Sequence, residues 1–98
     1  MSANEFTREL TLVNTHGLHL RPSSKFVTIA NGFEAEVFVS VNGMDEGDGK
    51  SILDLSAQAA AKGSVMKVRT VGVDAEAALE ALSALVRTGF GELTAEGL

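Results

Sequence analysis

The chain has 98 residues and 45% hydrophobic content, which suits one folded domain over residues 1–98 and excludes an intrinsically disordered protein. Its formal net charge of -5, with no Trp or Tyr, argues against nucleic-acid binding, because phosphate backbones need a basic surface. Cysteine is absent, no apolar run could cross a bilayer, and residues 1–10 do not resemble a signal peptide, so we expect a cytoplasmic protein that does not insert into membranes.

The first half of the chain predicts a strand, a helix and a hairpin. Residues 6–13 alternate between apolar and polar side chains, a pattern typical of a half-buried strand. Residues 20–31 change to a helical period, and Asn31-Gly32 predicts the end of that helix. Residues 36–41 predict a valine-rich strand, followed by Asn42-Gly43 as a hairpin signal. The return strand is expected within residues 44–50, short or at an edge, because this segment is polar and glycine-rich.

The second half predicts a helix, a strand and a longer helix. Residues 51–63 form the first of these, with Ser51 and Asp54 in capping-box spacing and Gly63 at the end. Residues 65–71 predict the last strand, and Asp74 is placed to cap a helix that ends near Gly89. The order is β-α-β-β-α-β-α. It predicts an α+β open-faced sandwich, a four-stranded antiparallel sheet with three helices on one face.

The segment GLHLRPSS at residues 17–24 joins the first strand to the first helix and is suited to binding an anion. His19 precedes the helix start, where backbone N–H groups lack partners and the macrodipole is positive. Arg21 adds a permanent charge and a planar set of donors that match phosphate oxygens. Pro22 gives up an N–H that would be unpaired in the first turn. Because neutral imidazole is nucleophilic near pH 7, His19 could accept a phosphoryl group directly.

Two other interpretations of this segment need no phosphoryl chemistry. A histidine near a helix start is often only a surface or capping residue. His16 and His19 could instead form a metal pair, but two ligands with no Asp, Glu or Cys close by make a poor site. We therefore expect neither a metal nor a cofactor.

Residues 17–27, GLHLRPSSKFV, resemble the active-site segment of the histidine-containing phosphocarrier (HPr) family of the bacterial phosphoenolpyruvate-dependent phosphotransferase system. The pattern of that family is Gly-Leu-His-x-Arg-Pro followed by small residues. The later segments NG, GKSILDL and AAAKGS are similar to the second segment of the family, and FGE at residues 90–92 resembles the end of many members. The resemblance covers about residues 5–92 and implies the same β-α-β-β-α-β-α fold.

The resemblance implies a function for this segment. His19 would be phosphorylated at Nδ1 by enzyme I and would pass the group to an EIIA-type acceptor, supporting sugar uptake or regulation. Arg21 would bind the phosphoryl group, supported by the backbone amides of Leu20 and Arg21. Such a protein is a stoichiometric carrier rather than an enzyme, and we expect a monomer.

The resemblance also marks a regulatory candidate and a docking face. Ser51 matches the serine that HPr kinase/phosphorylase modifies in many Gram-positive members, although Ser51 is also a good N-cap without any regulation. Members of the family present apolar side chains beside the histidine to their partners. An alternative interpretation keeps Ile52 in the core and exposes only Leu53. The docking residues expected here are Leu20, Ser24, Ile52 and Leu53, with Val27 as a weaker candidate.

Acidic residues depart from the family pattern. Asp45, Glu46, Asp48 and Asp54 stand where relatives often have neutral or basic residues, and they could select partners by repulsion. The sequence leaves open the sugar-transport branch and a nitrogen-related paralogue, NPr. A module that only binds regulators is a third reading, against which the presence of His19 weighs. A small-ligand-binding domain is disfavoured, because the sequence shows no aromatic-lined pocket.

Overall fold

The structure is a computed structural model that describes residues 4–92. Its elements follow the predicted order, with a short 3-10 helix added after the last α-helix. In chain order they are β1 (Glu5–Thr11), α1 (Leu20–Ala30), β2 (Glu36–Val41), β3 (Gly47–Asp48), α2 (Ile52–Ala57), β4 (Val65–Val71), α3 (Ala75–Arg87) and η1 (Gly89–Gly91).

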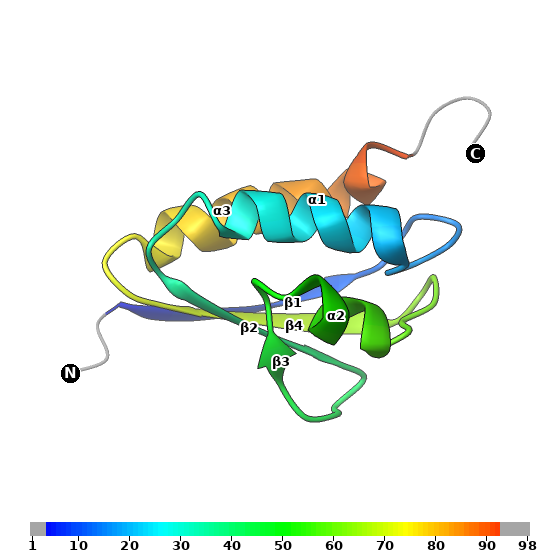
Figure 1. Cartoon of the computed structure of the whole chain (residues 1–98), viewed down its shortest axis with the longest axis horizontal. Helices are drawn as coiled ribbons and strands as arrows, with labels where there is room; N and C mark the ends of the chain where they lie inside the picture. The colour runs from blue at the N-terminus through cyan, green and yellow to red at the C-terminus, as the bar shows by residue number, and fades with distance from the viewer. Residues whose placement is uncertain (1–3, 93–98) are drawn as a thin grey trace.

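The predicted open-faced sandwich is confirmed. The four strands form one antiparallel sheet in the order β1-β4-β2-β3. Arg69 of β4 pairs with Thr7 on one side and with Phe38 on the other, which fixes the register. The three α-helices lie on one face of this sheet (Figure 1). β3 is only two residues long and lies at the edge, as its polar, glycine-rich sequence predicts.

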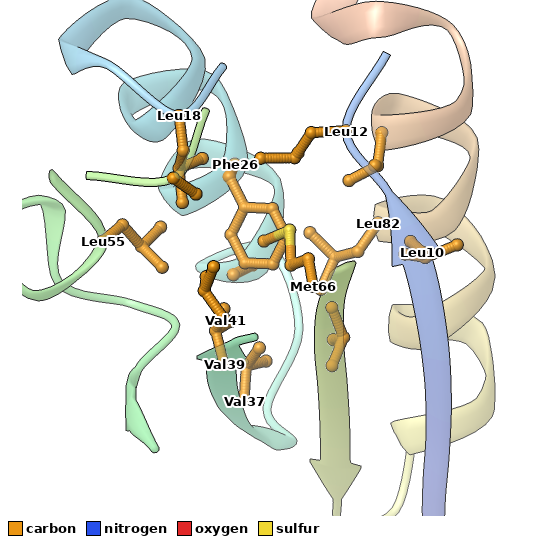
Figure 2. Close-up of a cluster of buried hydrophobic side chains, with 14 of the residues drawn as sticks. Leu10, Leu12, Leu18, Phe26, Val37, Val39, Val41, Leu55, Met66 and Leu82 are labelled. Atoms are coloured by element: carbon orange, nitrogen blue, oxygen red, sulfur yellow. The ribbon is translucent and has the colours of Figure 1, made fainter. Parts of the chain in front are cut away.

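The core fills the space between the sheet and the helices, and Phe26 of α1 lies within it beside Val41, Met66 and Leu82 (Figure 2). Strand alternation supplies one wall, since every second side chain of β2 and β4 points inward. Burial of a side chain as large as Phe26 contributes about 1.5–3 kcal/mol to stability. This anchoring of α1 also fixes the direction in which its first turn points.

Helix α2 is shorter than predicted. It ends at Ala57 rather than at Gly63. Ala59 adopts a left-handed φ of 49°, which no α-helix tolerates. The next carbonyl, that of Ala60, accepts a hydrogen bond of 2.8 Å from the backbone N–H of Leu18. The alanine-rich sequence favours a helix, but the left-handed residue and this tertiary hydrogen bond override the propensity and tie the segment to the loop that carries His19.

Asp74 occupies the N-cap position of α3 as predicted, but its side chain makes no capping bond. Its carboxylate oxygens accept the backbone N–H groups of Glu34 at 2.9 Å and Ala35 at 2.8 Å. The bond from Glu34, with the one from Ala35, holds the pKa of the Asp74 carboxyl below its ordinary value. Asp74 therefore joins the loop before β2 to the start of α3.

Candidate active site

His19 is the N-cap residue of α1 and leaves its side chain free. Its backbone is extended, with φ -89° and ψ -168°, and its carbonyl accepts the N–H of Ser23 at 3.0 Å. The imidazole makes no capping hydrogen bond, and its side chain is 41% exposed. The ring therefore stands at the helix start, accessible from outside, without occupying the helix amides.

The first turn of α1 has a positive potential that no carboxylate of the same turn cancels. The N–H groups of Leu20 and Arg21 have no intrahelical acceptor at these positions, and the turn holds no acidic residue. Pro22 has no N–H to leave unpaired and packs its ring inward, since it is buried. These two amides are thus available to an anion carried by the ring of His19.

Arg21 follows His19 on this turn and is exposed to solvent. Within residues 4–92 no ion pair engages its guanidinium group. A long, uncommitted cation beside the helix start can approach an anion bound there. His19, Leu20 and Arg21 are therefore brought together, as the sequence predicts.

The loop before α1 is fixed by Gly17 and Leu18. Gly17 has a φ of +64°, and a Cβ at this position would overlap the carbonyl oxygen of Ala60. Leu18 is fully buried in the core. These contacts fix the course of the backbone directly before His19.

A carboxylate that sequence reasoning missed faces the imidazole. Oε2 of Glu92 lies 3.6 Å from Nε2 of His19. The buried amide of Asn14 holds this carboxylate, because its Nδ2 donates to Oε1 of Glu92 at 3.1 Å and to the carbonyl of Gly17 at 2.8 Å. The only signal in the sequence was the resemblance of FGE to the end of family members, which says nothing of a contact across 73 residues.

The segment after α3 brings Glu92 to this place. Gly89, Phe90 and Gly91 all have positive φ, of 65°, 59° and 75°. Phe90 is fully buried, and its carbonyl accepts a 2.7 Å hydrogen bond from Nζ of Lys25 on α1. This tight turn is thus packed and bonded against the helix that carries the histidine (Figure 1).

The second histidine lies close to the first. The ring centroids of His16 and His19 are 5.7 Å apart, with the rings nearly perpendicular. In the described part of the chain no group of three or more His, Cys, Asp or Glu side chains could hold a metal ion.

The expected docking residues lie on α1 and α2, which pack against each other. Leu20 and Leu53 are 67% and 81% exposed, whereas Ser24 and Ile52 are half-buried. Ile52 also packs against the core, so the alternative that gave it a core role is partly right. Val27, the weaker candidate, was wrongly considered for this face: it is buried in the core.

Ser51 is the N-cap of α2. Its hydroxyl oxygen accepts the N–H of Asp54 at 3.1 Å, as the capping-box spacing predicts. The Asp54 carboxylate does not return to the N–H of Ser51. It accepts the N–H of Asp48 at 2.9 Å instead, so half of the capping box forms.

The acidic residues before α2 differ in how far their charge is compensated. Glu46 accepts hydrogen bonds from both Nε and Nη2 of Arg69, at 2.9 and 2.8 Å. Arg69 also stacks over the ring of Phe38, 4.2 Å from its centroid. Asp48 and Asp54, near the start of α2, accept hydrogen bonds only from backbone amides and have no ion-pair partner among the described residues.

Comparisons with known proteins find similar sequences over most of this chain. The family model described as the PTS HPr component phosphorylation site matches residues 6–88. The phosphocarrier protein HPr of Neisseria meningitidis serogroup A is 41% identical over 85 residues, which cover 87% of this chain and 94% of that protein. In the residues described here, no helix is both long and apolar enough to span a membrane.

Solved structures extend the likeness to the fold. A crystal structure of HPr from Thermoanaerobacter tengcongensis superposes with a TM-score of 0.85 at 30% identity, covering 91% of this chain and 99% of that one. HPr from Bacillus anthracis gives a TM-score of 0.78 at 36% identity, with 84% and 96% covered.

Proposed function

The chain belongs to the HPr family of phosphocarrier proteins of the phosphotransferase system, and from this membership we propose that His19 is the residue that carries the phosphoryl group. One observation carries the proposal: the imidazole of His19 is exposed at the N-cap of α1 without making a capping bond. A nucleophile is thus adjacent to unpaired amides that favour negative charge. The protein acts in the cytoplasm in this proposal.

The transfer is a displacement at phosphorus. The lone pair of His19 Nδ1 attacks the phosphoryl group of a phosphorylated donor histidine, the new Nδ1–P bond forms, and the N–P bond of the donor breaks with its electron pair returning to the donor nitrogen. Onward transfer repeats the exchange with His19 as the leaving group. Because little other chemistry is needed, the protein has mainly to supply position and positive potential.

Arg21 supplies the mobile part of that potential. Its guanidinium is exposed and unpaired among the described residues, so it can bind two phosphoryl oxygens in a planar fork. The N–H groups of Leu20 and Arg21 act as fixed donors beside it. Fixed and mobile donors together would stabilise the dianion on His19 and still release it to the acceptor.

The partners are enzyme I as donor and an EIIA-type domain as acceptor. Both would dock on the surface formed by Leu20, Ser24, Ile52 and Leu53, hereafter the docking patch. Its exposed leucines supply apolar contact, and the uncompensated charges of Asp48 and Asp54 at its edge would disfavour acidic partner surfaces. Purified EIIA domains of the sugar and nitrogen branches, offered in parallel to the charged protein, would assign the branch by which one takes up phosphate.

Intact mass spectrometry tests the assignment. Incubation with enzyme I, phosphoenolpyruvate and Mg²⁺ should add one acid-labile phosphoryl group to the parent and none to His19→Ala. His16→Ala is the matched control, because it removes an imidazole 5.7 Å away and should leave phosphorylation intact. A parent that gains no mass would support a module that only binds regulators, and a phosphorylated His19→Ala would move the site elsewhere.

A further inference from the structure

The imidazole of His19 has one carboxylate neighbour among the described residues. Glu92 faces it from the segment after η1, with Oε2 at 3.6 Å from Nε2. The other charged or titratable groups on this side are His16, edge-on in the same loop, and Arg21, on the first turn of α1. Lys25 is committed to the carbonyl of Phe90. The carboxylate of Glu92 is therefore the negative group that lies beside Nε2 among the described residues.

The position of this carboxylate is built into the fold. Asn14 is fully buried and donates from Nδ2 to both Glu92 and the carbonyl of Gly17. Because both neighbours are acceptors, the NH₂ end of the amide has to face them. Glu92 itself is only 18% exposed in its side chain, so its carboxylate is held rather than free in solvent.

A carboxylate at Nε2 decides which ring nitrogen carries the proton. Neutral imidazole has one N–H, and a negative charge beside Nε2 favours that N–H on Nε2. Nδ1 then keeps its lone pair and can attack phosphorus. When the Nδ1–P bond forms, Nε2 retains its proton and the ring becomes a cation, whose charge faces the carboxylate. When the phosphoryl group leaves, the bonding electrons return to Nδ1 and the ring is neutral again.

We propose that Glu92, held by Asn14, is a positioning residue that fixes the proton of His19 on Nε2 and stabilises the cationic ring during phosphoryl transfer. This inference rests on the proposed function of His19. It assigns to the segment after α3 a role in transfer, beyond its packing against α1.

The substitution Glu92→Gln should reverse the tautomer preference of the His19 ring, while the side chain keeps its size and shape. The Oε1 of the glutamine would still accept from Asn14, so its NH₂ group would face Nε2 of His19. An NH₂ donor there favours a lone pair on Nε2 and a proton on Nδ1, which lowers the fraction of rings whose Nδ1 lone pair is free to attack. We expect phosphorylation by enzyme I to slow about two- to fivefold, within the range expected for a partly exposed charged contact.

Two measurements on the full chain test this inference. The ¹⁵N chemical shifts of the His19 ring give the tautomer without any phosphoryl donor, and a quench assay gives the rate with enzyme I and phosphoenolpyruvate. Glu9→Gln is the matched control, because Glu9 is an exposed glutamate on β1 and its change removes the same charge. A shift toward Nδ1–H with a slower rate, in Glu92→Gln alone and with an unchanged melting temperature, supports the role.

The inference and the proposed function fail separately. If Glu92→Gln keeps the proton on Nε2, or is phosphorylated as fast as Glu9→Gln, Glu92 has no positioning role, while a phosphorylated parent leaves His19 as the carrier. If the parent itself takes up no phosphate, the proposed function is wrong and the role of Glu92 in transfer falls with it, whatever tautomer the shifts report.

Discussion

In the proposed function, His19 turns a capping position into a reactive one. A serine or aspartate at an N-cap binds the helix amides with its own oxygen and satisfies them. An imidazole with no capping bond leaves those amides open, and at His19 it also stays exposed. The same residue thus begins the helix and presents a nucleophile at its positive end.

The guanidinium of Arg21 is expected to matter for rate and not for folding. Arg21→Lys should retain the melting temperature of the parent, because the side chain is exposed. Phosphoryl transfer should slow about fivefold in both directions, because an ammonium group cannot hold two oxygens in a planar fork. Rapid-quench rates with enzyme I and with an EIIA domain measure this; equal rates for parent and variant would remove Arg21 from the mechanism.

Substitutions at Gly17 and at a control glycine distinguish the cost of backbone strain from the cost of steric overlap. Gly17→Ala should destabilise the protein by about 3 kcal/mol, since φ is +64° and the new Cβ would overlap the carbonyl of Ala60. Gly43→Ala is the matched control: its φ is +79°, but nothing lies within 4 Å of the new Cβ, so it should cost only about 1 kcal/mol. Urea unfolding gives both values. Equal losses would show that the Gly17 loop yields at no cost.

Under the proposed function, the start of α2 is the element on which partner docking should depend. Leu53→Glu should leave the melting temperature nearly unchanged, because the side chain is 81% exposed. It should raise the KM for phosphorylation by enzyme I about tenfold, because a charge would replace an apolar contact in the docking patch.

Val73→Glu is the matched control for this substitution. Val73 is 79% exposed but lies between β4 and α3, at the other end of the molecule from the start of α1 (Figure 1). It should be phosphorylated like the parent. If Leu53→Glu and Val73→Glu give the same KM as the parent, enzyme I does not use the docking patch. A Leu53→Glu protein that unfolds would instead make Leu53 part of the core.

The junction between the loop before β2 and α3 should respond to acid. Because the hydrogen bonds from Glu34 and Ala35 lower the pKa of Asp74, its contribution to stability is complete above the pKa of an unfolded aspartate, about 4. That contribution is lost as pH falls through the lower folded pKa. Asp74→Asn should therefore be less stable than the parent at pH 7, with the difference shrinking below about pH 4.

Urea unfolding over a pH series measures this difference. Asp45→Asn changes an exposed aspartate before β3 and should follow the parent throughout. A stability gap between parent and Asp74→Asn that is constant with pH would show that the carboxylate charge contributes nothing to the junction.

For the molecule as a whole, the sequence predicts the elements that follow from local hydrophobic periodicity. It misses the features that depend on contacts between residues far apart in the chain. Residues 36–41 alternate and the apolar residues of α3 form one stripe, because each element turns one face to the core. Both elements were therefore predictable. The end of α2 was not, because the carbonyl of Ala60 is committed to Leu18 across the structure. Nor were the partners of Asp74, 39 and 40 residues away.

The candidate site divides in the same way. The places of His19 and Arg21 at the helix start were predictable, because their neighbours in the chain define both that start and the family motif. Glu92 was not, since its distance to His19 depends on three successive residues with positive φ and on the bond from Lys25 to Phe90. The placement of these two residues could thus be predicted from the motif, whereas the carboxylate beside Nε2 required the assembled fold.

In the proposed function, the assembled site presents one atom, Nδ1 of His19, to the phosphoryl donor. NMR of the ¹⁵N-histidine-labelled protein can identify the atom that reacts. After incubation with enzyme I and phosphoenolpyruvate, we expect a ³¹P–¹⁵N coupling to Nδ1 of His19, with Nε2 still protonated and the ring of His16 unmodified. A coupling to Nε2 of His19, or to either nitrogen of His16, would mean that neither the amides of α1 nor the carboxylate of Glu92 directs the transfer.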